Sequence, residues 1–339
     1  MPFVLLWLFF HVAYERRFRD GYKMKPLYLK EEDIEKLITV PEVIELLDAA
    51  FRDQSAGRAW NNPRTRLRVA GGSLHLMAGA IPGYFGYKAY TIGGGQTKFF
   101  FFLYSAQTMD LLALMEADTL GQKRTGAATG LATRVLANPD STEATLFGAG
   151  WQAQTQLLAI DAVRKLKRVF VLSRRPERRD EFIRKMQPQV KAELVAARSA
   201  EEAVRASQIV TTITNTREPV LKGEWLQPGT HVNAAGGNSM IRSEFDNEVV
   251  LRSNCLVVDS IEQCKIEDGE FLTAIETGKR HWEDFTELRD VVAGCKPGRT
   301  NASDITVFKS GGIALEDVAI GRIIYERAIE RGVGRHLDI

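Results

Sequence analysis

A strict alternation of short apolar runs with amphipathic segments, between residues 143 and 213, limits the fold of this chain more than any other feature. The runs have the length of buried strands, and the segments between them have helical periodicity. The expected strands are Glu143–Phe147, Arg168–Leu172, Ala192–Val195 and Gln208–Ile213, and the expected helices are Trp151–Leu166, Pro176–Met186 and Ser199–Ala206. This alternation predicts an α/β fold with a doubly wound parallel sheet, which further strands at His231–Ala235 and Cys255–Val258 extend.

The turn after the first of these strands reads GAGWQA, a GxGxxA pattern at residues 148–153. It lies between an apolar strand and a long amphipathic helix, which is the context that a Rossmann dinucleotide site requires. Gly148 permits the tight turn, Gly150 lets the backbone approach a pyrophosphate, and the small Ala153 allows close packing of helix on strand. The phosphates are expected at the N-terminus of the helix, beside Ala149, Trp151 and Gln152.

The second strand ends at Ser173-Arg174-Arg175, where a site that prefers NAD usually has an acidic residue for the ribose hydroxyls. A hydroxyl and two guanidinium groups suit the additional 2′-phosphate of NADP instead. We therefore expect NADP(H) to be preferred and NAD(H) to be possible. The alternative is that both arginines are solvated residues ahead of a helix that begins at Pro176. Thr125 and Thr214 complete the expected cofactor-binding residues.

The chain before residue 120 has a mixed pattern that predicts an α+β unit. Its expected elements are a helix over Val40–Phe51 and strands at Arg64–Val69, His75–Met77, Phe99–Tyr104 and Leu111–Glu116. A closing helix is expected from about Gly312 to Glu330. The prediction is thus a Rossmann domain, residues 124–305, inserted into an α+β substrate-binding and dimerisation domain, residues 24–123 and 306–339.

The first domain offers three cations as candidates for the reactive site: Arg64, Lys88 and Arg124. The two arginines can pair with a carboxylate through two parallel hydrogen bonds. Lys88 has apolar and aromatic neighbours, so burial can lower its pKa enough for proton exchange. Composition alone would leave each of them a surface cation.

Several motifs in order along the chain resemble the ornithine cyclodeaminase/mu-crystallin family. They are PRT around Arg64, HLM and GYK before and at Lys88, LGQKRTGAATGLATRVLANPDS, LFGAGWQAQTQL, TREPVLKGEWLQPGTHVNAAGGN and DITVFKSGGIALEDVA. The resemblance runs from about Met24 to the C-terminus. It implies a bound nicotinamide cofactor, an amino or imino acid substrate held by Arg64, Lys88 and Arg124, and a homodimer formed through the first domain.

One residue departs from the cyclodeaminase pattern. Cyclodeaminases have an aspartate shortly after the NAxG turn for proton transfer with the substrate amine, and this chain has Asn238 there. An amide cannot act as a general base, although it can hydrogen-bond a substrate nitrogen. Lys88 is then the expected proton donor or acceptor, with Asn238 beside it as the second catalytic residue.

We therefore expect an NAD(P)-dependent oxidoreductase that interconverts an amino acid and its imino or keto acid. It would be either an alanine-dehydrogenase-like enzyme or a reductase of a cyclic imine such as pyrroline-carboxylate. The alternatives are ornithine cyclodeaminase itself, which forms proline and ammonia, and a cofactor-dependent small-ligand binding protein like mu-crystallin. The sequence does not identify the substrate side chain.

Composition excludes several other classes of protein. The 339 residues carry a formal net charge of +2 without a block of like charges, so neither a nucleic-acid nor a membrane partner is expected. Three cysteines without a CxxC pair indicate a reducing, cytoplasmic location, and scattered histidines predict no metal. The apolar run Phe3–Phe10 is too short to span a bilayer. We expect residues 1–23 to be a non-native extension ahead of Met24, the alternative being an apolar arm that packs on the body.

Overall fold

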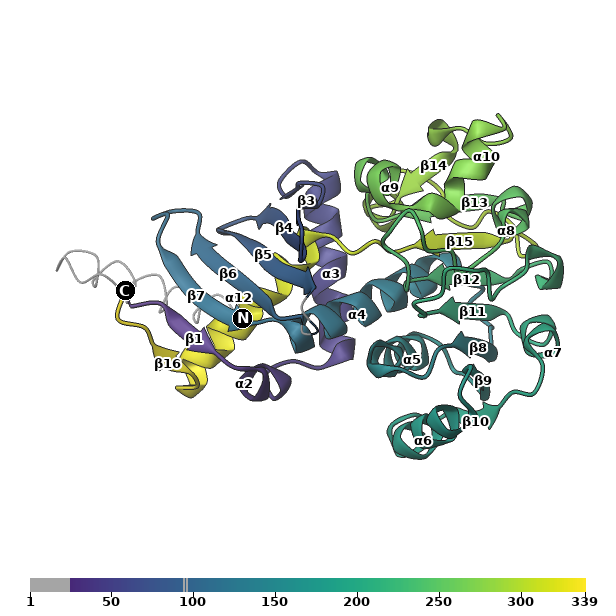
Figure 1. The fold of residues 1–339 in the computed structure, drawn as a ribbon, viewed down its shortest axis with the longest axis horizontal. Coiled ribbons are helices and arrows are strands. Elements are labelled where there is room, and N and C mark those ends of the chain that lie inside the picture. Colours follow the sequence, from purple (N-terminus) through teal and green to yellow (C-terminus); the bar gives the residue numbers. More distant parts are fainter. Residues whose placement is uncertain (1–24, 94, 96) are drawn as a thin grey trace.

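A computed structural model describes residues 25–93, 95 and 97–339, and it places two sheets side by side (Figure 1). The prediction for residues 1–23 lies outside the described residues. The α/β fold class is confirmed, because one of the two sheets is entirely parallel and the other is mixed and mostly antiparallel.

The parallel sheet has the strand order β10-β9-β8-β11-β12-β15-β13-β14. Its strands are β8 (Glu143–Phe147), β9 (Arg168–Leu172), β10 (Glu193–Ala196), β11 (Ile209–Thr212), β12 (His231–Ala234), β13 (Cys255–Val258), β14 (Phe285–Glu287) and β15 (Thr306–Lys309). The helices between them are α5 (Trp151–Val163), α6 (Pro176–Met186), α7 (Ala200–Arg205), α8 (Asn247–Arg252), α9 (Ile261–Glu267), α10 (Leu272–Glu276) and α11 (Leu288–Val292). Every strand and helix predicted between residues 143 and 258 is present, with ends that differ by at most three residues.

The mixed sheet has the order β16-β1-β7-β6-β5-β4-β2, and β3 pairs with β4. Its strands are β1 (Leu27–Leu29), β2 (Trp60–Asn61), β3 (Thr65–Val69), β4 (Gly72–Ile81), β5 (Tyr84–Gly93), β6 (Phe99–Ser105), β7 (Leu111–Glu116) and β16 (Arg335–His336). The helices α2 (Glu31–Glu35), α3 (Val40–Ser55), α4 (Asp118–Leu136) and α12 (Ala314–Arg331) accompany this sheet.

The long hairpin of β4 and β5 is the main difference from the sequence prediction, which had only a short strand at His75–Met77. The two strands pair along their whole length, from Gly72 opposite Gly93 to Ile81 opposite Tyr84. Glycines inside the strands conceal this pattern in the sequence. A Cβ atom at Gly79 would lie 2.9 Å from the backbone nitrogen of Leu315 in α12, so close packing of the helix on the sheet requires glycine there.

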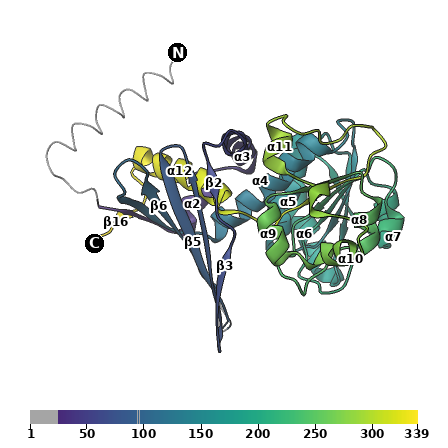
Figure 2. The same ribbon diagram turned by 90° about the horizontal axis from the view of Figure 1, so that it is seen from above.

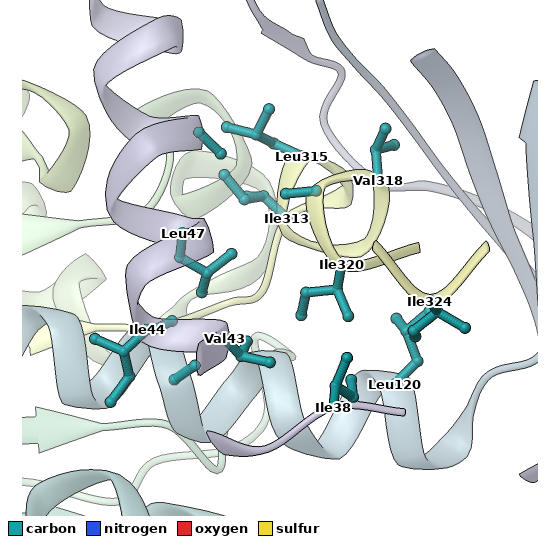
Figure 3. Close-up of a cluster of buried hydrophobic side chains, with 14 of the residues drawn as sticks. Ile38, Val43, Ile44, Leu47, Leu120, Ile313, Leu315, Val318, Ile320 and Ile324 are labelled. Carbon is teal, nitrogen blue, oxygen red and sulfur yellow. The ribbon is translucent and has the colours of Figure 1, made fainter. Parts of the chain in front are cut away.

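The hydrophobic core of the first domain lies where α3, α4 and α12 meet (Figure 3). The helices contribute Val43 and Ile44 from α3, Leu120 from α4, and Ile320 and Ile324 from α12, all buried. This core holds α12 against one face of the mixed sheet, and α4 continues from that sheet to pack on α5 (Figure 2). No described helix is long and apolar enough to cross a membrane.

The chain returns from the parallel sheet to the mixed sheet later than predicted. Strand β15 was assigned to the first domain, but it pairs in parallel with β12 and β13. The return therefore follows Lys309, through the segment Ser310–Gly312, and this segment lies at the carboxyl ends of the parallel strands.

Candidate active site

A cavity of about 890 Å³ lies between the two sheets, at the carboxyl ends of the parallel strands. In open α/β sheets this edge is where ligands bind. All fourteen site residues predicted from the sequence line this one cavity. They are Arg64, Lys88, Arg124, Thr125, Gly148, Ala149, Gly150, Trp151, Gln152, Ser173, Arg174, Arg175, Thr214 and Asn238.

The turn between β8 and α5 has the geometry that a pyrophosphate needs. Gly148 has a φ of +120°, and a Cβ atom there would lie 2.5 Å from the carbonyl oxygen of Ile213. Gly150 caps α5, and a Cβ atom at this position would meet no protein atom within 4 Å and would project into open space. The first backbone N–H groups of the 13-residue helix therefore remain accessible to phosphate oxygens. The residues present fit a bound dinucleotide.

The end of β9 presents cations to the cavity without an acidic residue. Arg174 and Arg175 are exposed, and the hydroxyl oxygen of Ser173 accepts a hydrogen bond from the backbone nitrogen of Arg175 (3.3 Å). Arg178, in the first turn of α6, also lines the cavity and was missed in the sequence. Its spacing of three residues from Arg175 was the available signal, because residues i and i+3 share one side of a helix. None of the three arginines forms an ion pair with another described residue.

Lys88 lies at the opposite end of the cavity, on β5, where it faces α12. Its side chain is 2% exposed, and its Nζ atom donates a hydrogen bond to Oδ1 of Asp317 (2.8 Å). The pKa of Lys88 is lowered to about 8, mainly by burial and also by the nearby Arg124, whereas Asp317 acts in the opposite direction. A lysine with such a pKa can exchange protons near neutral pH.

Arg124 comes from α4 and is held by two adjacent acids of α12. Its Nη1 atom donates to Oε2 of Glu316 (3.0 Å) and its Nε atom to Oδ1 of Asp317 (3.2 Å). The guanidinium lies against Gly312, whose φ is +74° and where a Cβ atom would collide with Nη1. Nη2 of Arg124 makes no hydrogen bond to the described residues and remains available to a ligand.

Arg64 is 4% exposed, and most of its donors are occupied by the protein. Its Nη1 atom donates to Oε2 of Glu267 (2.5 Å), and Nη2 donates to the carbonyl oxygens of Gly311 (2.9 Å) and Gly312 (3.0 Å). The Nε–H group has no partner among the described residues. Arg64 is therefore anchored in a fixed orientation.

Sequence reasoning missed three buried acids that contact the cations of the site: Glu267, Glu316 and Asp317. They do not line the cavity but hold its cations from behind, and all three are fully buried. Burial raises the pKa of Glu316 to about 8, and Arg124 opposes this shift. The signal in the sequence was an adjacent pair of acids inside the otherwise apolar start of the last helix.

Four largely apolar side chains form the remaining wall next to Lys88: Met77, Tyr90, Ile92 and Phe99. Tyr90 stacks between His75 and Phe99, with ring centroids 4.6 Å apart in both pairs. Arg242 also lines the cavity, whereas no aspartate or glutamate among the described residues does. The substrate end of the cavity therefore combines cations with an apolar wall.

Comparison with protein families gives a match between residues 24–332 and the model of the ornithine cyclodeaminase/mu-crystallin family. The chain belongs to this family. The resemblance inferred from the sequence motifs is thus confirmed, and the matched range begins at Met24. Both sheets and the cavity between them lie within the family match, apart from β16.

Members of this family with similar sequences include enzymes of amino and imino acid chemistry. The alanine dehydrogenase of Archaeoglobus fulgidus is 34% identical over 319 residues, which cover 92% of this chain and 98% of that protein. A Delta(1)-pyrroline-2-carboxylate reductase of Bacillus cereus is 31% identical over 324 residues, covering 92% and 99%.

Two solved structures from the family share this fold. The Thermococcus litoralis Delta(1)-pyrroline-2-carboxylate reductase, in complex with NADH and L-proline, has a TM-score of 0.87 and 36% identity. It is matched over 92% of this chain and 100% of its own. An archaeal alanine dehydrogenase dimer with bound NAD has a TM-score of 0.88 and 32% identity, covering 93% and 100%.

Proposed function

We propose that this protein is an NAD(P)-dependent oxidoreductase that interconverts an amino acid and its imino or keto acid. The observation that carries the proposal is a buried lysine with a lowered pKa, placed between two anchored arginines in the same cavity as a dinucleotide turn. The similarity to alanine dehydrogenase and to pyrroline-2-carboxylate reductases supports the same chemistry.

The arginines orient the substrate. A substrate carboxylate can accept a hydrogen bond from Nη2 of Arg124, which makes none to the described residues, and the buried Arg64 guanidinium adds positive charge at the same end of the cavity. Because both guanidinium groups are already fixed by buried acids, little side-chain entropy is lost when the substrate binds. The carboxylate is then held with its α-carbon toward the cofactor end of the cavity.

Lys88 manages the proton on the substrate nitrogen. The bound dinucleotide supplies or accepts the hydride at the α-carbon. In the direction of reduction, the Lys88 ammonium gives its proton to the imine nitrogen, so hydride and proton together convert C=N into CH–NH. In the direction of oxidation, the neutral amine of Lys88 takes a proton from the substrate nitrogen. Water can then hydrolyse the imine to a keto acid and ammonia. Asn238 supplies a hydrogen bond to the same nitrogen without exchanging a proton.

The absence of acidic residues from the described lining of the cavity favours this function over ornithine cyclodeaminase. A diamino acid brings a second ammonium group into the site, and burial of a charge without a partner is unfavourable. Seven cations line the cavity: Arg64, Lys88, Arg124, Arg174, Arg175, Arg178 and Arg242. The apolar wall instead suits an aliphatic side chain or the ring of a cyclic imine.

We propose NADP(H) as the preferred cofactor, on the basis of Arg174, Arg175 and Arg178 at the end of β9. The two solved relatives described above hold NADH and NAD, so NAD(H) remains the alternative. The proposal depends on the absence of a carboxylate among the described residues lining this end of the cavity.

We also propose a homodimer formed through the mixed sheet. The archaeal alanine dehydrogenase described above is a dimer, which supports the oligomeric state. The sheet face opposite α12 carries stacked aromatic pairs, Phe85 with Tyr104 and Tyr87 with Phe102, which are only half-buried. A partly exposed aromatic face of this kind is typical of a subunit interface. The free thiols of Cys255, Cys264 and Cys295 support the proposal of a cytoplasmic location.

Absorbance at 340 nm tests the function directly. The protein is mixed with NADPH or NADH and a panel of keto acids with ammonia or cyclic imines, and with the oxidised cofactors and amino acids. A net change identifies the oxidoreductase. Proline formed from ornithine without a net change would identify a cyclodeaminase, and binding without turnover would identify a ligand-binding protein.

A further inference from the structure

A third arginine, Arg66, crosses the cleft two residues after Arg64. Residues i and i+2 of an extended segment point to the same side, so both guanidinium groups reach toward the parallel sheet. Nη2 of Arg66 donates a hydrogen bond to the carbonyl oxygen of Asn238 (2.9 Å) and lies 2.9 Å from Oε1 of Glu267. Arg66 thus joins strand β3 of the mixed sheet to the loop after β12.

The Glu267 carboxylate lies between the two arginines. Oε2 pairs with Arg64 and Oε1 with Arg66, and the carboxylate itself is fully buried. A buried charge is stable only when it is paired, so this acid keeps both guanidinium groups in place. The position of Arg66 is therefore tied to that of Arg64, which we assign to the substrate carboxylate.

His75 supports Arg66 from the other side. It lies opposite Arg66 in the β3–β4 pair, and its Nδ1 atom is 3.3 Å from Nε of Arg66. Burial lowers the pKa of His75 to about 4, with smaller contributions from Arg66 and Arg64, so the ring is neutral at pH 7. A neutral ring can accept the Nε–H hydrogen bond at Nδ1 while its Nε2–H group donates to the hydroxyl of Ser73 (2.8 Å).

The loop that carries Asn238 has few other constraints. The bond from Arg66 is the only hydrogen bond of Asn238 to another described residue. Its side-chain amide has no partner there, although it lines the cavity. Gly236, two residues earlier, is held by Oε2 of Glu244 (2.7 Å), so Arg66 is the described side chain that fixes the backbone of residue 238 itself.

We propose that Arg66 is a positioning residue that holds the Asn238 amide against the substrate nitrogen and couples this loop to the carboxylate site through Glu267. The proposal rests on the proposed function, since Asn238 acts on a substrate nitrogen only in that chemistry. Arg66 does not contact the substrate itself but acts through the backbone of residue 238.

A double-mutant cycle tests this role in the full chain with NADPH bound. Arg66→Ala is expected to lower kcat/KM about tenfold, in the range of one lost hydrogen bond to a charged group, with NADPH affinity within about twofold of wild type. If Arg66 acts through Asn238, the kcat/KM of the double mutant Arg66→Ala/Asn238→Ala is at most about twofold lower than that of Asn238→Ala alone. Losses that multiply, or an unchanged Arg66→Ala enzyme, would overturn the proposal.

Two further variants separate positioning from general stability. Arg66→Lys keeps a cation beside Glu267 and is expected to recover most of the activity. Arg68→Ala is the matched control, because Arg68 lies on the same side of β3, is exposed and has no partner among the described residues. Activity loss in Arg68→Ala equal to that in Arg66→Ala would contradict a specific role.

Hydrogen–deuterium exchange gives a readout that does not depend on turnover. Arg66→Ala should exchange faster than wild type across residues 236–243, and Arg68→Ala should not. Unchanged exchange in Arg66→Ala would overturn the proposal even in an active enzyme. A wild-type protein that turns over no amino or imino acid would contradict the proposed function, and the exchange experiment would still decide the role of Arg66.

Discussion

The cations at the two ends of the cavity differ in their burial and in their ion pairing. At the substrate end, Arg64, Lys88 and Arg124 are buried and each is paired with a buried acid. At the end of β9, Arg174 and Arg175 are exposed and have no ion pair with a described residue. The first arrangement fixes the orientation of a ligand before it arrives. The second provides exposed charge for the 2′-phosphate of the proposed NADP(H), so substitutions at the two ends should affect different quantities.

Substitution of Lys88 should have the largest effect. Lys88→Ala should reduce turnover about 10²–10⁴-fold, the range expected for loss of a general acid or base. Asp317 keeps its contact with Arg124, so the fold and the cofactor site should remain. Steady-state kinetics and NADPH fluorescence measure the two effects, with exposed Lys98→Ala as the control. A variant that retains turnover would show that another group carries the proton.

The pH dependence should reverse with the direction of the reaction. Reduction needs the Lys88 ammonium, whose pKa is about 8, so its rate should fall about tenfold per pH unit above pH 8. Oxidation needs the neutral amine, so its rate should rise through the same range and level off above it. Profiles of kcat/KM in both directions measure this.

A variant at Glu316 tests which group causes the inflection of the pH profiles near pH 8, because the pKa of Glu316 is also raised to about 8. Glu316→Gln keeps the size of the side chain and should leave the inflection near pH 8 in place. Loss of the inflection in this variant would assign the titration to the acid behind Arg124 instead of Lys88.

Substitution of Arg174 should change cofactor affinity and leave turnover at saturation intact. A charge-assisted hydrogen bond to phosphate contributes about 1.5–3 kcal/mol, so Arg174→Ala should weaken NADPH by about tenfold or more and NADH hardly at all. Fluorescence titration with both cofactors measures the difference. Arg184→Ala, at an exposed arginine near the end of α6, is the control. Equal losses for NADPH and NADH would refute the phosphate assignment.

Substitution of Asn238 should have a smaller effect than substitution of Lys88 or Arg174. A neutral hydrogen bond contributes about 0.5–1.5 kcal/mol, so Asn238→Ala should reduce turnover by about tenfold at most. Asn238→Asp restores the acid of cyclodeaminases, and mass spectrometry would show whether a trace of proline then forms from ornithine. Complete loss of turnover in Asn238→Ala with an active Lys88→Ala would reverse the roles given to the two residues.

Local sequence patterns were sufficient for the parallel sheet and its dinucleotide turn. The strands and helices from Glu143 to Val258 follow from short apolar runs that alternate with amphipathic segments, a pattern that is local in the sequence. The turn at Gly148 follows from a backbone conformation and a close approach that only glycine allows. The β4–β5 hairpin did not follow, since Gly79 is required by contact with α12, more than 200 residues later, and Gly86 by contact with β6.

The sequence by itself determined the candidates for the chemistry, which are the motifs around Arg64, Lys88 and Arg124 and the asparagine at position 238. Only the tertiary structure decided the burial, the orientation and the ion-pair partners of these groups. Glu267, Glu316 and Asp317 come from distant helices, and their effect on each cation depends on burial and on distances of about 3 Å. Electrostatic interactions at such distances in a buried site depend on the fold that brings the charges together, and sequence spacing carries no record of them.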